Sequence, residues 1–253
     1  MAGGKRSDLG VRTVSAVVMV SVAGLALWLG GAVWTALVCA VALGVLWEWI
    51  TLARRGTDRP VERGLWNFAG MVYVGVGAAM LLFLRNPVFS LAPLLTVLAA
   101  VIAVDVGAYF SGRTFGGPKI APSISPSKTW SGLVGGVLGA TLALFGAAML
   151  WRAGAIGITA PGAGPAPQGC FGSGTCWYLR ANAVAVFAQC LLTGLILAIC
   201  AQGGDFFESW MKRRAGVKDS GSLIPGHGGF FDRADGLLAV LFLLALMLLF
   251  QPR

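Results

Sequence analysis

Long apolar segments separated by short polar ones dominate this 253-residue chain, which is 57% hydrophobic. The apolar runs approach or exceed the roughly 20 residues that a helix needs to cross a bilayer. Seven candidate spans follow from them: residues 11–29, 32–50, 66–84, 90–112, 132–151, 179–201 and 236–250. The last is short for a span, so we expect it to be tilted, extended or partly buried in protein. The pattern predicts an all-α fold, a polytopic integral membrane helical bundle of about seven spans, or eight to nine if some helices are split.

Basic residues are unevenly divided between alternate loops. With the N-terminus in the cytoplasm, fifteen Lys and Arg residues fall in inside segments, and only Arg85, Arg152, Arg180 and Arg253 fall outside. This positive-inside bias predicts a multi-pass protein of the cell (inner) membrane whose polar cavity faces the cytoplasm. The net charge of +9 is assigned to orientation and anionic lipid head groups, so no nucleic-acid partner is expected.

The loop at residues 152–178 is rich in Gly and Pro and lies on the predicted outer side. Cys170 and Cys176 lie in it, and an oxidising exterior would allow either a disulfide or two free thiols. Cys39, Cys190 and Cys200 lie in apolar runs and are interpreted as small core residues. None of the cysteines has the spacing of metal ligands.

Charge is concentrated at residues 203–235, which hold five of the ten acidic residues and the only histidine, His227. Gly203 and Gly204 are expected to end the preceding apolar run. A short helix is then expected to reach about Arg214, with Asp205, Glu208 and Lys212 on one face.

The second half of this segment, residues 216–229, contains five glycines and Pro225, which predicts a loop carrying Lys218, Asp219 and His227. A new helix is predicted to begin near Phe231. Asp232 and Asp235 then lie on one face of its first turn, where the helix dipole favours anions.

Two other polar places interrupt the apolar pattern. Asp105 lies within a predicted span, where a lone carboxylate is costly, so we expect it to face protein, a cation or water; a purely structural hydrogen bond is the alternative. Residues 113–132 combine glycines, prolines and hydroxyls with Lys119 and Lys128, and end where a helix begins. Backbone amides at that helix start, with Ser125, Thr129 and Lys128, predict a phosphate site.

Together these residues indicate metal-dependent phosphate chemistry. Asp105, Asp205, Asp232 and Asp235 offer hard oxygen ligands, which suit Mg²⁺ better than zinc. The nearby basic residues would compensate several phosphate charges, and phosphoryl or nucleotidyl transfer requires mainly such positioning and neutralisation. A GxxxxGK[ST] loop is absent from the sequence, so a P-loop NTPase is not indicated.

The segment at 203–235 resembles the signature of the CdsA-type phosphatidate cytidylyltransferases (CDP-diacylglycerol synthases). The residues that carry the resemblance are Ser209, Met211, Lys212, Arg213, Lys218, Asp219, Gly221, Ile224, Pro225, His227, Gly228, Gly229, Phe230, Asp232, Arg233 and Asp235. The segments DVGAYFSGRTFGGPK and ISPSKTW are similar to a second polar region of that family. Ala234 and Ser131 depart from its usual pattern.

The resemblance implies transfer of CMP from CTP to phosphatidic acid, with an N-terminal transmembrane region at 1–85 and a catalytic one at 86–253. It implies Mg²⁺ bound directly by Asp205 and Asp232, with Asp235, Asp105 and Glu208 as further ligands or supporting groups, and a monovalent cation such as K⁺ beside it. Lys218 and His227 are assigned to catalysis. The expected substrate-binding residues are Lys128, Ser125, Thr129, Lys119, Lys212, Arg233 and Asp219. The resemblance also implies a homodimer that is embedded in membrane lipid.

Alternatives stay open at this stage. An ion-coupled transporter would use Asp105 and broken helices as an ion site, and a related transferase would act on a polyprenyl phosphate. Among single residues, Lys212 and Arg213 could anchor the helix to anionic lipid, and Asp219 could cap a turn. His227 could make only a structural hydrogen bond.

Overall fold

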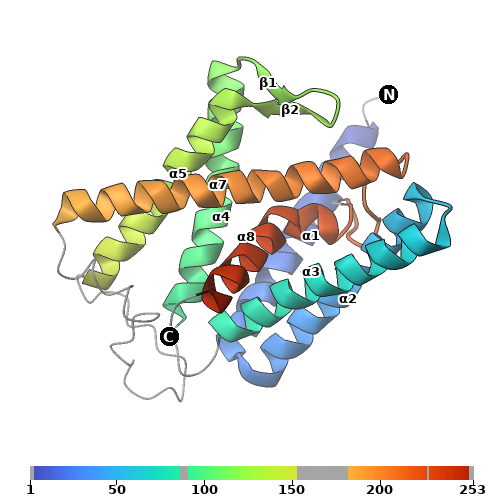
Figure 1. Ribbon diagram of the computed structural model, residues 1–253, viewed down its shortest axis with the longest axis horizontal. Coiled ribbons are helices and arrows are strands. Elements are labelled where there is room, and N and C mark those ends of the chain that lie inside the picture. The colour runs from blue at the N-terminus through green and yellow to red at the C-terminus, as the bar shows by residue number, and fades with distance from the viewer. Residues whose placement is uncertain (1–2, 86–90, 153–181, 227, 251–253) are drawn as a thin grey trace. The chain divides into compact units, whose positions relative to one another are not determined.

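The computed structural model describes residues 3–85, 91–152, 182–226 and 228–250. Its elements are α1 (Gly3–Leu29), α2 (Gly31–Gly56), α3 (Pro60–Leu84), α4 (Ala92–Phe115), β1 (Lys119–Ala121), β2 (Ser125–Thr129), α5 (Trp130–Arg152), α7 (Ala183–Arg214) and α8 (Phe231–Leu249) (Figure 1). Six of these helices, α1 to α5 and α7, are long and apolar enough to cross a membrane. The protein is therefore an all-α, multi-pass membrane protein, as predicted.

The helix α8 is not among those six. It has 19 residues and carries three charged residues near its start, Asp232, Arg233 and Asp235. Its beginning at Phe231 agrees with the prediction, as does the beginning of α5 at Trp130. The expectation that α8 forms a seventh span stays a prediction.

The break predicted at Gly203 and Gly204 is wrong, because α7 runs without interruption from Ala183 to Arg214. A glycine inside a helix costs only about 1 kcal/mol relative to alanine. Packing on both sides outweighs that cost: Gln202 is buried before the glycines, and Met211 is buried after them.

The described chain divides into two compact units, and α7 belongs to both. The first comprises Met1–Leu82 and Phe207–Arg253. Its core centres on Trp49 of α2, whose ring lies 5.5 Å from the rings of both Phe207 and Phe231 and 5.7 Å from that of Tyr73. The indole Nε1 of Trp49 also donates a 2.8 Å hydrogen bond to the carbonyl of Trp66. This packing ties α2, α3, α7 and α8 together around one aromatic core.

The second unit comprises Phe83–Phe206, in which α4 and α5 run side by side over most of their length (Figure 1). Glycines allow the close approach: a Cβ on Gly136 would lie 3.2 Å from the Val104 carbonyl oxygen, and one on Gly132 would lie 3.1 Å from that of Ala108. These glycines therefore serve helix packing.

A two-stranded antiparallel hairpin lies at one end of the α4–α5 pair, with Lys119 opposite Thr129 and Ala121 opposite Ser125 (Figure 1). The sequence predicted only an irregular loop at residues 113–132. The strands are three and five residues long, Pro118 and Pro122 flank β1 and Pro126 lies inside β2, so no alternating apolar pattern marks them. The domain division predicted at residue 85 stays a prediction.

Candidate functional site

In the first unit, Lys212 joins two carboxylates near the end of α7. Its Nζ lies 2.6 Å from Glu208 Oε2 and 2.7 Å from Asp232 Oδ1. Only 3% of the Glu208 side chain and 9% of the Asp232 side chain are exposed. Glu208 and Lys212 are four residues apart on one helix, whereas Asp232 comes from the first turn of α8. The structure therefore brings together three of the predicted site residues.

The other oxygen of Asp232 is held by the loop before α8. Asp232 Oδ2 accepts hydrogen bonds from the backbone N–H of Ser220 at 3.0 Å, the Ser220 hydroxyl at 2.9 Å and the backbone N–H of Gly229 at 2.9 Å. A carboxylate oxygen with three donors is saturated. Asp232 therefore uses Oδ2 for the loop and Oδ1 for Lys212.

A buried glutamate from α2 completes this arrangement. Glu48 is 2% exposed and accepts hydrogen bonds from the backbone N–H groups of Phe230, at 3.0 Å, and Phe231, at 2.8 Å. Its Oε2 also lies 3.0 Å from the Ser220 hydroxyl. We call Glu48, Glu208, Lys212, Ser220 and Asp232 the Asp232 cluster.

The loop is packed tightly against these carboxylates. A Cβ on Gly221 would lie 2.5 Å from Glu48 Oε1, and one on Gly228 would lie 2.9 Å from Asp232 Oδ2. Gly228 also has φ +85°, which L side chains rarely adopt. Glycine at these positions lets backbone amides reach the carboxylates directly.

Electrostatics favour an ionised Asp232. Burial of its carboxyl opposes the charged form, but hydrogen bonds with Glu208 and Lys212, and one from the Gly229 backbone, outweigh burial and hold the pKa of Asp232 below its usual range. The remaining oxygen of Glu208, Oε1, is buried and has no hydrogen-bond partner among the residues that the structure describes. An unpaired buried oxygen is costly, and this one is available to a cation.

The second unit contains a separate ion pair. Lys128 of β2 forms a salt bridge with Asp205 of α7, and its Nζ lies 5.6 Å from the centre of the Phe206 ring. The Lys128 side chain is 23% exposed and that of Asp205 is 19% exposed. This pair also joins two predicted site residues, but solvent reaches it more easily than the Asp232 cluster.

The hydroxyl groups near Lys128 in the sequence contact other residues within positions 116–132. Thr129 Oγ1 accepts a 3.1 Å hydrogen bond from the backbone N–H of Gly132 and so caps the start of α5. Ser131 donates to the Gly116 carbonyl, and Ser125 lies 3.5 Å from the hydroxyl of Ser127. Thr129 and Ser125 are buried, whereas Lys119 is exposed on β1. The predicted phosphate site therefore retains Lys128 and Lys119 as its accessible cations.

The other predicted site residues that the structure describes lie on α4, on the loop before α8 and on α8 itself. Asp105 is exposed on α4, and Arg233 is exposed in the first turn of α8. Lys218 and Asp219 are exposed on the loop, as predicted from its glycines. Asp235 Oδ1 accepts a 2.9 Å hydrogen bond from the backbone N–H of the next residue. His227 lies outside the described residues.

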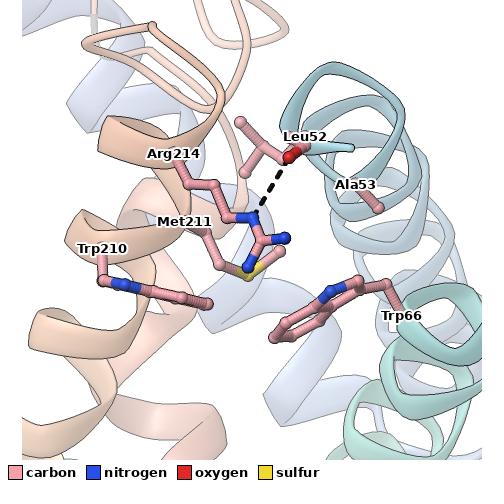
Figure 2. Close-up of a pocket in the computed structure, with 7 residues that line it drawn as sticks. Leu52, Ala53, Trp66, Trp210, Met211 and Arg214 are labelled. Atoms are coloured by element: carbon pink, nitrogen blue, oxygen red, sulfur yellow. Dashed lines mark hydrogen bonds between the residues drawn. The ribbon is translucent and has the colours of Figure 1, made fainter. Parts of the chain in front are cut away.

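A small hollow elsewhere in the first unit does not fit a substrate. Figure 2 shows Trp66, Trp210 and Arg214 around it, and Leu52, Ala53, Gly56 and Met211 complete the lining. Its volume is about 10 Å³, which is near the minimum for one water molecule. The Arg214 guanidinium lies 5.6 Å from the Trp210 ring, and its Nε donates to the Gly56 carbonyl at 3.1 Å (Figure 2). This hollow is interpreted as helix packing.

The carboxylate oxygens near Lys212 are the candidates for holding a metal ion. Among the described residues, no three Asp, Glu, His or Cys side chains are grouped so as to hold a metal ion. The donor set of the Asp232 cluster nevertheless suits a hard cation, because oxygens of Glu208 and Asp232 both lie within 2.7 Å of one ammonium group. The unpartnered Glu208 Oε1 adds a third oxygen. Glu208 and Asp232 therefore fit Mg²⁺ as ligands if Lys212 gives way.

Sequence reasoning missed Glu48 and Ser220. Glu48 is a lone carboxylate inside the apolar run LWEWI, and the cost argument applied to Asp105 applies to it equally. Nothing in the local sequence marks Ser220, because its contacts come from residues 12 and 172 positions away.

Comparison with known proteins covers most of the chain. Residues 55–251 match the model of the cytidylyltransferase family. The phosphatidate cytidylyltransferase of Brucella suis is 31% identical, covering 95% of this chain and 93% of the relative. That of Rickettsia bellii is also 31% identical, covering 92% and 88%, and that of Rickettsia felis is 29% identical, covering 96% and 94%. The chain belongs to the cytidylyltransferase family.

Proposed function

We propose that this protein transfers CMP from CTP to phosphatidic acid, giving CDP-diacylglycerol and pyrophosphate. The observation that carries the proposal is its similarity, along more than 90% of the chain, to relatives named phosphatidate cytidylyltransferase. The structure supports it with a charged cluster at the end of a long apolar helix. A lipid phosphate and a soluble nucleotide can meet at such a place.

In the proposed reaction, a phosphate oxygen of phosphatidic acid attacks the α-phosphorus of CTP in line. The bond between that phosphorus and the oxygen leading to the β-phosphate breaks, and pyrophosphate leaves with the electron pair. The attacking oxygen is already anionic, so it needs little help from a general base. Both reactants are polyanions, and the main task of the protein is to hold them together and offset their charge.

The Asp232 cluster is proposed to perform that task. Asp232 is assigned to direct Mg²⁺ coordination, because its Oδ2 is fixed by the loop while Oδ1 faces the cation Lys212. Glu208 and Asp235 are assigned as further ligands or supporting groups. Mg²⁺ held by these residues would supply positive charge that offsets the charge of the phosphates. Lys212, released from its carboxylates, would pair with a phosphate.

Lys128 and the remaining predicted site residues are given further roles. Lys128 is assigned to a phosphate, because it is a partly exposed ammonium on the hairpin. Direct metal binding by Asp205 and a supporting role for Asp105 stay predictions, as do a K⁺ ion and the catalytic roles of Lys218 and His227. We also propose that the protein is a homodimer of the inner membrane with its site facing the cytoplasm, following the positive-inside bias.

The proposal is tested by pyrophosphate release from purified protein in detergent. CTP, phosphatidic acid and Mg²⁺ are supplied together and then omitted one at a time, and an undecaprenyl phosphate replaces phosphatidic acid in a parallel assay. Release that needs all three components is expected. Release only with the polyprenyl phosphate would reassign the lipid substrate, and no release from folded protein with either lipid would contradict the proposal.

A further inference from the structure

Burying the carboxylate of Glu48 at its position in α2 is energetically unfavourable. It lies in α2, a candidate membrane span, and is 2% exposed among apolar neighbours that include Trp49 and Val45. Removing a carboxylate from water is unfavourable unless hydrogen bonds replace the lost hydration. A residue without a task at this position would be expected to be apolar.

The contacts of Glu48 supply that replacement and converge on one loop. Both of its oxygens are used: Oε1 accepts from Phe230 N–H, and Oε2 accepts from Phe231 N–H and lies 3.0 Å from the Ser220 hydroxyl. These donors stand at both ends of the loop that closes on Asp232. A side chain from α2 thus fastens a loop more than 170 residues away in the sequence.

Helix α8 depends on this carboxylate for its start. The first backbone N–H groups of a helix have no partner within the helix, and they carry partial positive charge. The residue before α8, Phe230, makes no side-chain capping bond. Glu48 takes the place of the missing cap from another helix, and its negative charge suits that end of α8.

The link to Asp232 runs through Ser220 and Phe231. The Ser220 hydroxyl lies between Glu48 Oε2 and Asp232 Oδ2, at 3.0 and 2.9 Å. Phe231, whose N–H bonds to Glu48, directly precedes Asp232 in the first turn of α8. Movement of Glu48 would therefore shift the backbone and the hydroxyl that fix the Asp232 carboxylate.

We propose that Glu48 is a positioning residue for Asp232: its carboxylate fastens the start of α8 and Ser220, so that Asp232 presents Oδ1 in a fixed direction. The inference rests on the proposed function of Asp232 as a metal ligand. Groups that orient a metal ligand typically change metal affinity or activity by about 10- to 100-fold when they are altered.

The test compares Glu48→Gln with a matched control, Glu62→Gln. Glu62 of α3 is also a hydrogen-bonded carboxylate, but it accepts hydrogen bonds from Thr57, Arg59 and Arg214, which all lie outside the loop. In Glu48→Gln the amide NH₂ faces backbone donors, so the hold on the loop weakens. We expect kcat to fall by about 10- to 100-fold and the Mg²⁺ concentration for half-maximal rate to rise, with the KM for phosphatidic acid nearly unchanged.

Hydrogen exchange gives a readout that does not need turnover. Peptides covering residues 219–236 should exchange faster in Glu48→Gln than in the wild type or in Glu62→Gln, while peptides from α4 and α5 should not change. A general loss of folding would instead raise exchange throughout. Unchanged exchange in this segment, or a kcat within about twofold of wild type in folded Glu48→Gln, would overturn the positioning role.

Ser220→Ala keeps the test decisive if Glu48→Gln does not fold. It removes only the hydroxyl between the two carboxylates, and we expect kcat to fall by roughly 3- to 10-fold with the same rise in Mg²⁺ requirement. Wild-type kinetics in Ser220→Ala, with Glu48→Gln unfolded, would also overturn the proposal. If the wild type itself has no cytidylyltransferase activity, the proposed function fails, while hydrogen exchange still reports whether Glu48 holds the loop.

Discussion

The Asp232 cluster and the Lys128–Asp205 pair are built from the same kinds of side chain in different ways. In the cluster, Asp232 has four hydrogen-bond donors around its two oxygens, three of them from the loop. In the pair, one lysine meets one carboxylate, and about a fifth of each side chain is exposed. The first is a buried network around Asp232, and the second is a more exposed ion pair that solvent reaches.

This difference indicates a division of labour. A buried carboxylate held by several hydrogen bonds is rigid, which suits the proposed role of Asp232 in holding an ion in a fixed position. A partly exposed ion pair is weak and exchanges easily, which suits the proposed role of Lys128 in binding a phosphate. Changes in the cluster should therefore affect both folding and chemistry, and changes in the pair mainly substrate binding.

The largest effect is expected from Asp232→Asn. An amide oxygen can still accept from Ser220 and Gly229, so the protein should fold and insert, but the negative charge is lost. We expect kcat to fall by about 10³-fold or more, measured as pyrophosphate release. Asp58→Asn, a change at an exposed carboxylate between α2 and α3, serves as the control. Turnover near that of wild type in Asp232→Asn would remove Asp232 from the chemistry.

Lys212→Met should show that the cluster also supports folding. It leaves Glu208 and Asp232 buried without their shared cation, and breaking a buried ion pair in this way costs roughly 3 kcal/mol or more. The unfolding temperature in detergent should fall clearly. Adding Glu208→Gln removes one of the two stranded charges and should recover part of the loss; equal unfolding temperatures for wild type and Lys212→Met would contradict a structural role.

Lys128→Ala should affect binding more than stability. The pair with Asp205 is partly exposed, so its loss should cost no more than about 1 kcal/mol of unfolding free energy. The KM for CTP should rise by roughly tenfold, the equivalent of one lost charge-assisted contact. Lys128→Arg, which keeps the charge, should retain most of the affinity. A large drop in unfolding temperature without a change in KM would reverse the division of labour.

The smallest effect is expected from Arg214→Ala. This arginine bonds to the Gly56 carbonyl and stacks near Trp210, but 40% of its side chain is exposed. We expect a loss of about 1 kcal/mol or less in unfolding free energy and no change in the KM for CTP. A marked rise in that KM would extend the nucleotide site to the hollow beside Trp66.

The helices were predictable because their signal is local. Apolar runs of span length appear directly in the sequence, and the predicted spans 11–29, 32–50 and 66–84 lie within α1, α2 and α3. The contact between Glu208 and Lys212 was predictable for the same reason, since helical periodicity places them on one face. The continuous α7 was not, because whether a helix continues through Gly203 depends on packing at both sides.

The contacts that hold the Asp232 cluster join residues that are far apart in the sequence. Glu48 and Ser220 are 172 residues apart and meet only after α2, α7 and α8 have packed together. A lone carboxylate in an apolar run signals that a partner exists, but it does not identify the partner. The hairpin β1–β2 was missed because strands of this length leave too little pattern to recognise.

The central claim, transfer of CMP to a lipid phosphate, is tested most directly by following labelled CTP. Purified protein is incubated with phosphatidic acid and Mg²⁺, using CTP labelled either at the α-phosphate or at the γ-phosphate. If the protein transfers CMP to phosphatidic acid, the α-label enters the organic-soluble lipid and the γ-label is released as pyrophosphate. Appearance of the γ-label in the lipid, or of neither label, would contradict nucleotidyl transfer by this protein.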